Sequence, residues 1–259
     1  MKKLILSTSH DGLVARLTMN SPENLNAMDD AMAAAFREAR AKLAQEELRA
    51  IVVTGEGRAF SAGGDLAMLY AKSQKDFATN QREMLEFYRS FLSLRDLNVP
   101  LICALQGHAV GAGFCFAAGC DLRIASRSAM FAAPFTRLGL YPGMGGSFFL
   151  PRSLGSEVAR ELMLTGRRLG ASEAKTLGFV SSVVEEEELE AALSDVLAGI
   201  LASAPKATQA LLRSQREAER PQLEAALLRE ATEQAECYAR PEFVEGLKAV
   251  EEKRSPIWP

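Results

Sequence analysis

The chain has 259 residues, of which 48% are hydrophobic and 24% are charged, and these ordinary globular values exclude disordered and fibrous proteins. Its 30 Lys and Arg against 33 Asp and Glu give a formal net charge of −3, so no basic excess is present for binding nucleic acid. Two histidines and four cysteines, none of them in a CxxC pair, leave no set of ligands for a zinc-type metal site.

The N-terminal residues are predicted to form a β-hairpin. Residues 3–7 form one strand, Asp11-Gly12 is a turn signal, and apolar residues alternate through 13–19 as in a strand with one buried face. Only three apolar residues follow the two lysines at the chain start, which is too few for a signal peptide. We therefore expect a cytoplasmic protein.

The middle of the chain repeats the order strand, glycine-rich loop, helix. Strands are predicted at 50–55, 101–106 and 121–126, and helices at 29–48 with Asp29 as the cap, at 65–71 and at 76–97. Such a repeat with short loops favours β-α units whose loops gather at one edge of a parallel sheet. The sequence therefore predicts an α/β fold.

One stretch of the chain, residues 99–120, has no charged residue and must be compared with a membrane span. Pro100 and four glycines interrupt it, so a buried strand, a glycine loop and a buried helix are expected instead, with no membrane association. Cys115 and Cys120 lie in this stretch and are expected to be buried, reduced thiols.

The sequence changes character after about Glu185. An acidic run at 185–188 suits a helix N-terminus, and mostly helical sequence follows. We expect an α/β core over residues 1–200 and a helical region over 201–259. The only tryptophan, Trp258, is expected to pack on another subunit, because an exposed terminal tryptophan is unfavourable.

Two glycine-rich loops, at residues 57–66 and 106–113, each lie between a buried strand and a helix. Backbone N–H groups at a helix N-terminus are unpaired and favour negative charge. Two such loops side by side can direct two N–H groups at one oxygen atom, which is an oxyanion hole. Two tight turns without a ligand are the alternative, and a P-loop is excluded because no GxxxxGK[ST] occurs.

These loops and several other segments resemble the crotonase superfamily, also called the enoyl-CoA hydratase/isomerase family, over nearly the whole chain. The matching segments are 24–28, 59–66, 99–113, 120–126, 138–146, 150–152, 245–246 and 252–254. The resemblance implies a spiral of ββα units with a helical C-terminal trimerisation region, and trimers that often pair into hexamers. The implied ligand is an acyl-CoA thioester, so coenzyme A is part of the substrate and no separate cofactor is expected.

The resemblance also implies roles for residues by position. The N–H groups of Gly64 and Ala112 would hold the thioester carbonyl and stabilise an enolate, although the family often has glycine in place of Ala112. Lys253 resembles a C-terminal lysine that reaches the coenzyme A phosphates, often across a subunit boundary. The residues expected to contact coenzyme A are Asn24, Leu25, Ala27, Ala62, Gly63, Asp65 and Leu66.

The chain departs from the family at the positions of the catalytic carboxylates. Family hydratases use two glutamates as general acid and base toward water, and these positions hold Cys115 and Phe135 here. Some family isomerases and hydrolases have an aspartate where this chain has Gly143. Because each positioned acid or base contributes about 10²–10⁴ in rate, decarboxylation, isomerisation or hydrolysis is favoured over hydration.

Four residues are candidates to take part in chemistry without those glutamates. Cys115 lies between two phenylalanines and is expected to pack rather than react. His108 can titrate near neutrality, although a structural role is preferred, and Tyr141 can protonate an enolate. Arg137 is expected to be a solvated arginine, with pairing to a malonyl-type carboxylate as the alternative.

Two acidic residues near the loops, Asp65 and Asp121, are expected to be structural, at a helix start and a strand start. Two other functions stay open for the chain as a whole. One is a non-catalytic acyl-CoA-binding protein or partner subunit, and the other is an enoyl-CoA hydratase with an unrecognised water-activating group.

Overall fold

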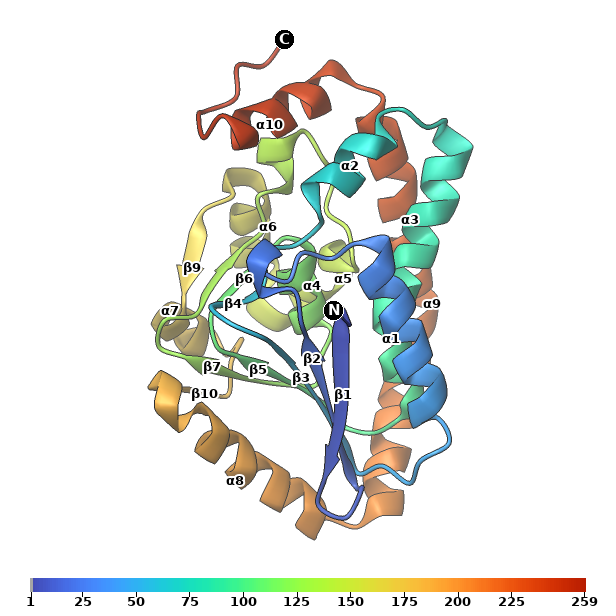
Figure 1. The fold of residues 1–259 in the computed structure, drawn as a ribbon, viewed down its shortest axis with the longest axis vertical. Coiled ribbons are helices and arrows are strands. Elements are labelled where there is room, and N and C mark those ends of the chain that lie inside the picture. Colours follow the sequence, from blue (N-terminus) through green and yellow to red (C-terminus); the bar gives the residue numbers. More distant parts are fainter. Residues whose placement is uncertain (1) are drawn as a thin grey trace.

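The computed structural model describes residues 2–259 (Figure 1). Within these residues the larger sheet has six strands in the order β1-β2-β3-β5-β7-β10. The strands are β1 (Leu4–Ser9), β2 (Val14–Met19), β3 (Ala50–Gly55), β5 (Leu101–Leu105), β7 (Leu122–Ser126) and β10 (Ser182–Val184). The β1-β2 hairpin is antiparallel and the other neighbours are parallel, which confirms the predicted hairpin and buried parallel strands.

A second, four-stranded sheet has the order β4-β6-β8-β9. Its strands are β4 (Ala59–Ser61), β6 (His108–Val110), β8 (Met130–Ala132) and β9 (Arg168–Gly170). Three times the chain passes from a strand of the larger sheet to a short strand of this sheet and then to a helix, as in the expected spiral of ββα units. Three-residue strands show no periodicity in the sequence, so only the loops around them were predictable.

Helices cover both faces of the larger sheet. They are α1 (Asp30–Leu43), α2 (Leu66–Lys72), α3 (Phe77–Leu92), α4 (Ala112–Ala118), α5 (Gly146–Leu154), α6 (Ser156–Thr165), α7 (Ala171–Thr176), α8 (Leu189–Ala202), α9 (Pro205–Tyr238) and α10 (Pro241–Glu251). Side chains alternate along β3, so that Val52 faces α8 while Ile51 and Val53 face the main core. Among residues 2–259 we find no helix with the length and hydropathy of a membrane span.

The first helix is shorter than predicted. The Asp29 side chain caps it by accepting a hydrogen bond from the Met32 N–H at 2.7 Å, as expected. The helix ends at Leu43 and not near Leu48. The N–H groups of Gln45 and Glu46 bond to carbonyls three residues back and not four, which tightens the last turn. Leu48 is then buried in the core ahead of β3.

The long helix α9 lies beside α3 over much of its length (Figure 1). Gln81 on α3 donates a hydrogen bond to Thr232 on α9 at 2.7 Å, and Arg89 pairs with Glu224 at 2.6 Å. The division into residues 1–200 and 201–259 stays a prediction. What matters for the site is that α9 brings residues from late in the chain against the loops of the α/β part.

Candidate active site

The two segments expected to contact coenzyme A lie side by side. The Met28 N–H donates to the Gly63 carbonyl at 2.7 Å, and the Asp65 N–H donates to the Met28 carbonyl at 3.0 Å. In this parallel bridge the flanking peptide groups make the bonds, so the N–H of Gly64 itself faces away from Met28. The Ala62 N–H also donates to the Leu25 carbonyl at 2.9 Å, which holds the first glycine loop at a second point, two residues before Gly64.

The second glycine loop lies against the first. A Cβ atom on Gly63 would lie 2.7 Å from the Val110 carbonyl oxygen and 3.4 Å from the Ala112 nitrogen. Gly63 also has a φ of +94°, so both its backbone conformation and this close approach require glycine. Ala112 is the first residue of α4, and its N–H therefore has no partner within the helix. The two glycine loops thus lie side by side.

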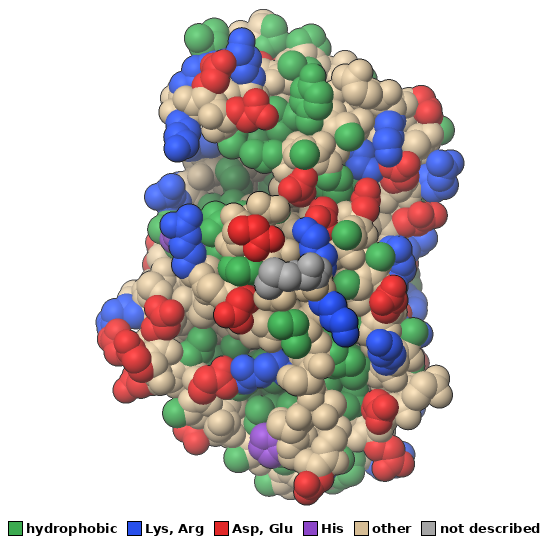
Figure 2. Space-filling model, in the orientation of Figure 1, with side chains coloured by type: hydrophobic (Ala, Val, Ile, Leu, Met, Phe, Trp, Pro, Cys, Tyr) green, Lys and Arg blue, Asp and Glu red, His purple; other side chains and the backbone are tan. Residues whose placement is uncertain are grey.

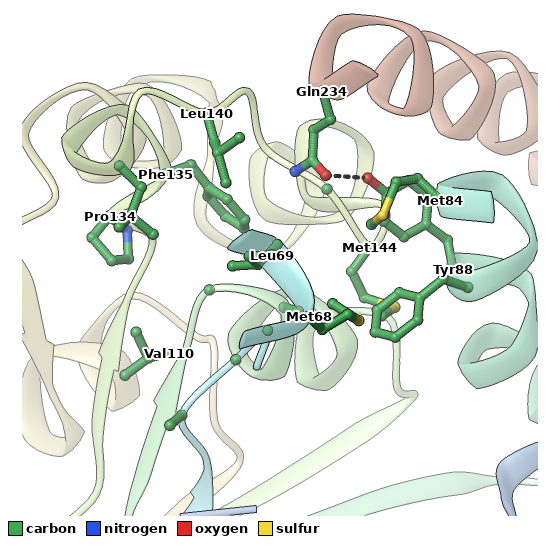
Figure 3. A pocket seen from close by; sticks show the side chains of 18 residues that line it. Met68, Leu69, Met84, Tyr88, Val110, Pro134, Phe135, Leu140, Met144 and Gln234 are labelled. Atoms are coloured by element: carbon green, nitrogen blue, oxygen red, sulfur yellow. Dashed lines mark hydrogen bonds between the residues drawn. The ribbon is translucent and has the colours of Figure 1, made fainter. Parts of the chain in front are cut away.

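Both loops border one cavity of about 70 Å³, here called the central cavity (Figure 3). It is lined by Ala62, Gly63, Gly64, Met68, Leu69, Met84, Phe87, Tyr88, Val110, Gly111, Ala112, Pro134, Phe135, Leu138, Leu140, Gly143, Met144 and Gln234. Among residues 2–259, those that line it include no Asp, Glu, His, Cys, Lys or Arg. Its polar side chains are Tyr88 and Gln234, and peptide groups supply its other polarity.

Tyr88 and Gln234 meet at the position where some family members have an aspartate. A Cβ atom on Gly143 would lie 2.7 Å from the Tyr88 hydroxyl oxygen and 2.8 Å from the Gln234 Nε2 atom. The Tyr88 hydroxyl donates to the Gln234 Oε1 atom at 2.7 Å (Figure 3). Sequence reasoning missed both residues, because one is on α3, the other is on α9, and neither belongs to a motif.

The two positions at which the family resemblance predicts glutamates in hydratases have different surroundings. Phe135 lines the central cavity and is 7% exposed, with its ring 3.9 Å from where a Cβ atom of Gly111 would lie. Cys115 is fully buried but does not line the cavity, since its Sγ atom faces Gly146. Burial raises the pKa of the Cys115 thiol well above its usual value, and Cys115 and Cys120 are both buried free thiols, as expected.

The other candidates from the sequence lie outside the central cavity. His108 is exposed on β6. Tyr141 lines a neighbouring groove of about 640 Å³ between α5, α6 and α9, and only its carbonyl faces Gln234, from which it accepts a hydrogen bond at 2.7 Å. Arg137 donates to the Thr165 carbonyl at 2.7 Å.

The two aspartates near the loops make structural contacts, as expected. Asp65 caps α2 by accepting from the Met68 N–H at 2.8 Å. Asp121 accepts from the Leu101 N–H at 2.7 Å and pairs with Arg216 at 2.6 Å. Neither lines the central cavity.

Sequence reasoning also missed a buried carboxylate, Glu230 on α9. It accepts hydrogen bonds from the Gly145 N–H at 2.7 Å, the Ser147 N–H at 2.8 Å and the Ser147 hydroxyl at 2.6 Å. Burial raises the pKa of Glu230 to about 7, although these three donors act in the opposite direction. Glu230 thereby holds the start of α5, directly after the cavity residues Gly143 and Met144.

A larger groove of about 930 Å³, here called the outer groove, adjoins the central cavity and shares four lining residues with it. These are Ala62, Val110, Pro134 and Leu138. The groove also contacts Leu66, Arg137, Arg254 and Trp258. Figure 2 shows the surface hollowed beneath the part of the molecule that contains α10. Trp258 thus lines a groove of its own chain, and the exposed Lys253 directly precedes Arg254.

Comparisons with known proteins agree with this fold. The family model described as Enoyl-CoA hydratase/isomerase matches residues 9–259. The chain is 36% identical to the probable enoyl-CoA hydratase EchA14 of Mycobacterium tuberculosis, covering 95% of this chain and 96% of that protein. It is 35% identical to 1,2-epoxyphenylacetyl-CoA isomerase of Escherichia coli K12, covering 99% and 98%. The crystal structure of an enoyl-CoA hydratase/isomerase from Pseudoalteromonas atlantica T6c matches over 100% of both chains with a TM-score of 0.87 and 32% identity.

Proposed function

The chain belongs to the enoyl-CoA hydratase/isomerase family of the crotonase superfamily, and from this membership we propose that it forms an enolate from an acyl-CoA thioester. The observation that carries the proposal is that Gly64 and Ala112, on two separate loops, border one small cavity. Two N–H groups directed at a thioester oxygen stabilise the negative charge that develops there, and each is worth about 10²–10³ in rate.

The placement of the ligand follows from the two connected spaces. The acyl group occupies the central cavity, and the coenzyme A part lies in the outer groove along segments 24–27 and 62–66. Arg137 lines this groove and supplies positive charge for the phosphates, together with the exposed Lys253. Arg254 also lines the groove but is paired with Glu245 and Glu252. A homotrimer or a dimer of trimers remains part of the proposal.

Among the possible reactions, decarboxylation of a malonyl-type thioester suits the cavity best. The bond between C2 and the carboxylate breaks, carbon dioxide leaves, and the electron pair forms the enolate held by Gly64 and Ala112. The enolate carbon then takes a proton from water. This reaction needs no general base, whereas hydration needs an acid and a base where the chain has Cys115 and Phe135. Isomerisation and hydrolysis are the next candidates.

The test is to incubate the protein in heavy water with a panel of malonyl-type, enoyl and saturated acyl-CoAs and to analyse the products by mass spectrometry. Gly64→Pro removes one donor N–H, and we expect it to lower the turnover of the accepted substrate at least about 100-fold. Gly64→Ala is the matched control, because it keeps the N–H and its Cβ atom meets only the flexible end of Leu69, at 3.3 Å. Unchanged turnover in Gly64→Pro would contradict the proposed role.

A second candidate is an acyl-CoA-binding protein without catalysis. It is favoured by the cavity lining, in which Tyr88 is the one titratable side chain among the described residues. Burial raises the pKa of this phenol far above its usual value, so it stays protonated and cannot act as a base. Retention of an acyl-CoA with no mass change and no deuterium uptake would support this candidate. Addition of water to an enoyl-CoA would instead show a hydratase with another water-activating group.

A further inference from the structure

Gln234 lines the central cavity and, among the described residues, has one hydrogen-bond donor to spare. It is 3% exposed, and its Oε1 atom accepts from the hydroxyl groups of Tyr88 at 2.7 Å and Tyr238 at 2.9 Å. Its Nε2 atom donates to the Tyr141 carbonyl at 2.7 Å. A primary amide has two N–H groups and two acceptor positions. Both acceptor positions are thus occupied, and within residues 2–259 one N–H has no partner.

The orientation of this amide is fixed by its neighbours. The Tyr141 carbonyl can only accept a hydrogen bond, so the nitrogen of Gln234 must face it. The oxygen then faces the two tyrosines, whose pKa values are both raised by burial, so that both hydroxyl groups keep their protons and donate. The Gln234 amide therefore cannot flip by 180°, and the group that remains free is an N–H donor and not the oxygen.

The location of the free donor sets the kind of acyl group that fits. The Gln234 nitrogen lies 2.8 Å from where a Cβ atom of Gly143 would be, in the wall of a cavity lined elsewhere by apolar side chains and peptide groups. The cavity volume of about 70 Å³ is well below the roughly 150 Å³ that holds a benzene molecule. Gly64, Ala112 and Gln234 thus border the same small cavity, which has room only for a short acyl group.

We propose that Gln234 is a specificity-determining residue that selects short acyl-CoAs with an acceptor oxygen at C3, as in a carboxylate, a ketone or an alcohol. The inference rests on the proposed function, because it takes the thioester to lie at Gly64 and Ala112. An acyl group without the oxygen leaves the buried N–H unpaired, which lowers affinity about 10- to 100-fold. The partner of a malonyl-type carboxylate is then Gln234 and not Arg137, whose guanidinium faces the Thr165 carbonyl.

The experiment compares two ligands of equal chain length, butyryl-CoA and 3-hydroxybutyryl-CoA, with each enantiomer of the latter measured separately. Dissociation constants are obtained by calorimetry for the full-length protein. We expect one enantiomer to bind at least about tenfold more tightly than butyryl-CoA. Gln234→Met, which keeps an unbranched side chain of similar length but has no N–H, should reduce this preference to less than threefold. Tyr238→Phe is the matched control, because Tyr238 contacts the same amide but does not line the cavity, and it should keep the preference.

The outcomes separate this inference from the proposed function. Equal affinity of the wild-type protein for all three ligands overturns the inference and leaves the proposed function standing. A preference that survives in Gln234→Met also overturns it. If none of the three acyl-CoA thioesters binds, the proposed function is overturned, and the inference with it. If Gln234→Met does not fold, the comparison of ligands on the wild-type protein decides.

Discussion

Gly143 lies where the family resemblance places an aspartate in some isomerases and hydrolases, and the structure leaves no space for a side chain there. Its Cβ position is occupied by the hydroxyl of Tyr88 and the amide of Gln234, at 2.7 Å and 2.8 Å. We expect Gly143→Ala to lower the free energy of unfolding by about 1–3 kcal/mol, because inserting a methyl group there must displace a buried hydrogen-bonded pair. Urea unfolding monitored by circular dichroism measures the change.

The matched control for Gly143→Ala is Gly199→Ala. Gly199 is exposed within α8, and a Cβ atom there would meet nothing within 4 Å. This substitution should stabilise the protein by about 0.5–1 kcal/mol, because alanine is the better helix former. Equal effects of the two substitutions would show that the Tyr88 and Gln234 side chains do not fill the space above Gly143.

At the scale of the element, Glu230 couples the start of α5 to pH. The pKa of an unfolded glutamate is about 4.5, and burial raises the pKa of Glu230 to about 7 in the folded chain. Between these values the folded state binds the extra proton, so this carboxyl stabilises the fold below pH 4.5 and loses that contribution as the pH rises through 7. The free-energy advantage of the wild type over Glu230→Gln should therefore shrink by about 3 kcal/mol between pH 4.5 and pH 8.

Urea unfolding of both proteins across this pH range checks the prediction. The control is Glu236→Gln, which changes an exposed glutamate further along the same helix and should leave the pH dependence unchanged. An advantage of the wild type that is constant or grows with pH would mean that the three donors from Gly145 and Ser147 outweigh burial, and that Glu230 is ionised throughout.

The elements show which parts of the site the sequence could predict. Local signals sufficed for the hairpin, the buried strands and the caps at Asp29 and Asp65, because each depends on neighbouring residues. The same holds for the two glycine loops. By contrast, Tyr88 and Gln234 are 146 positions apart and meet only because α9 packs along α3. No local pattern marks such a pair, and the same reason hid Glu230.

At the scale of the whole molecule, the C-terminal tail and the first glycine loop meet at the outer groove. Trp258, close to the C-terminus, lines it together with Ala62 and Leu66 from the first glycine loop. If Trp258 contacts the coenzyme A part, Trp258→Ala should weaken acyl-CoA binding about fivefold or more, as is typical when a buried aromatic contact is lost. Calorimetry with the ester that the wild type binds best measures this change.

The same variant distinguishes a role in the groove from a contact with another subunit. The family resemblance predicts a trimer, with a mass of about three times 28.1 kDa, and light scattering should find this mass unchanged in Trp258→Ala if the side chain serves its own groove. Ile257→Ala is the matched control, because Ile257 is 77% exposed and does not line the groove, so it should change neither affinity nor mass. A fall in mass for Trp258→Ala with unchanged affinity would instead place Trp258 in a subunit interface. The C-terminal tail would then hold the assembly together without contacting the ligand of its own chain.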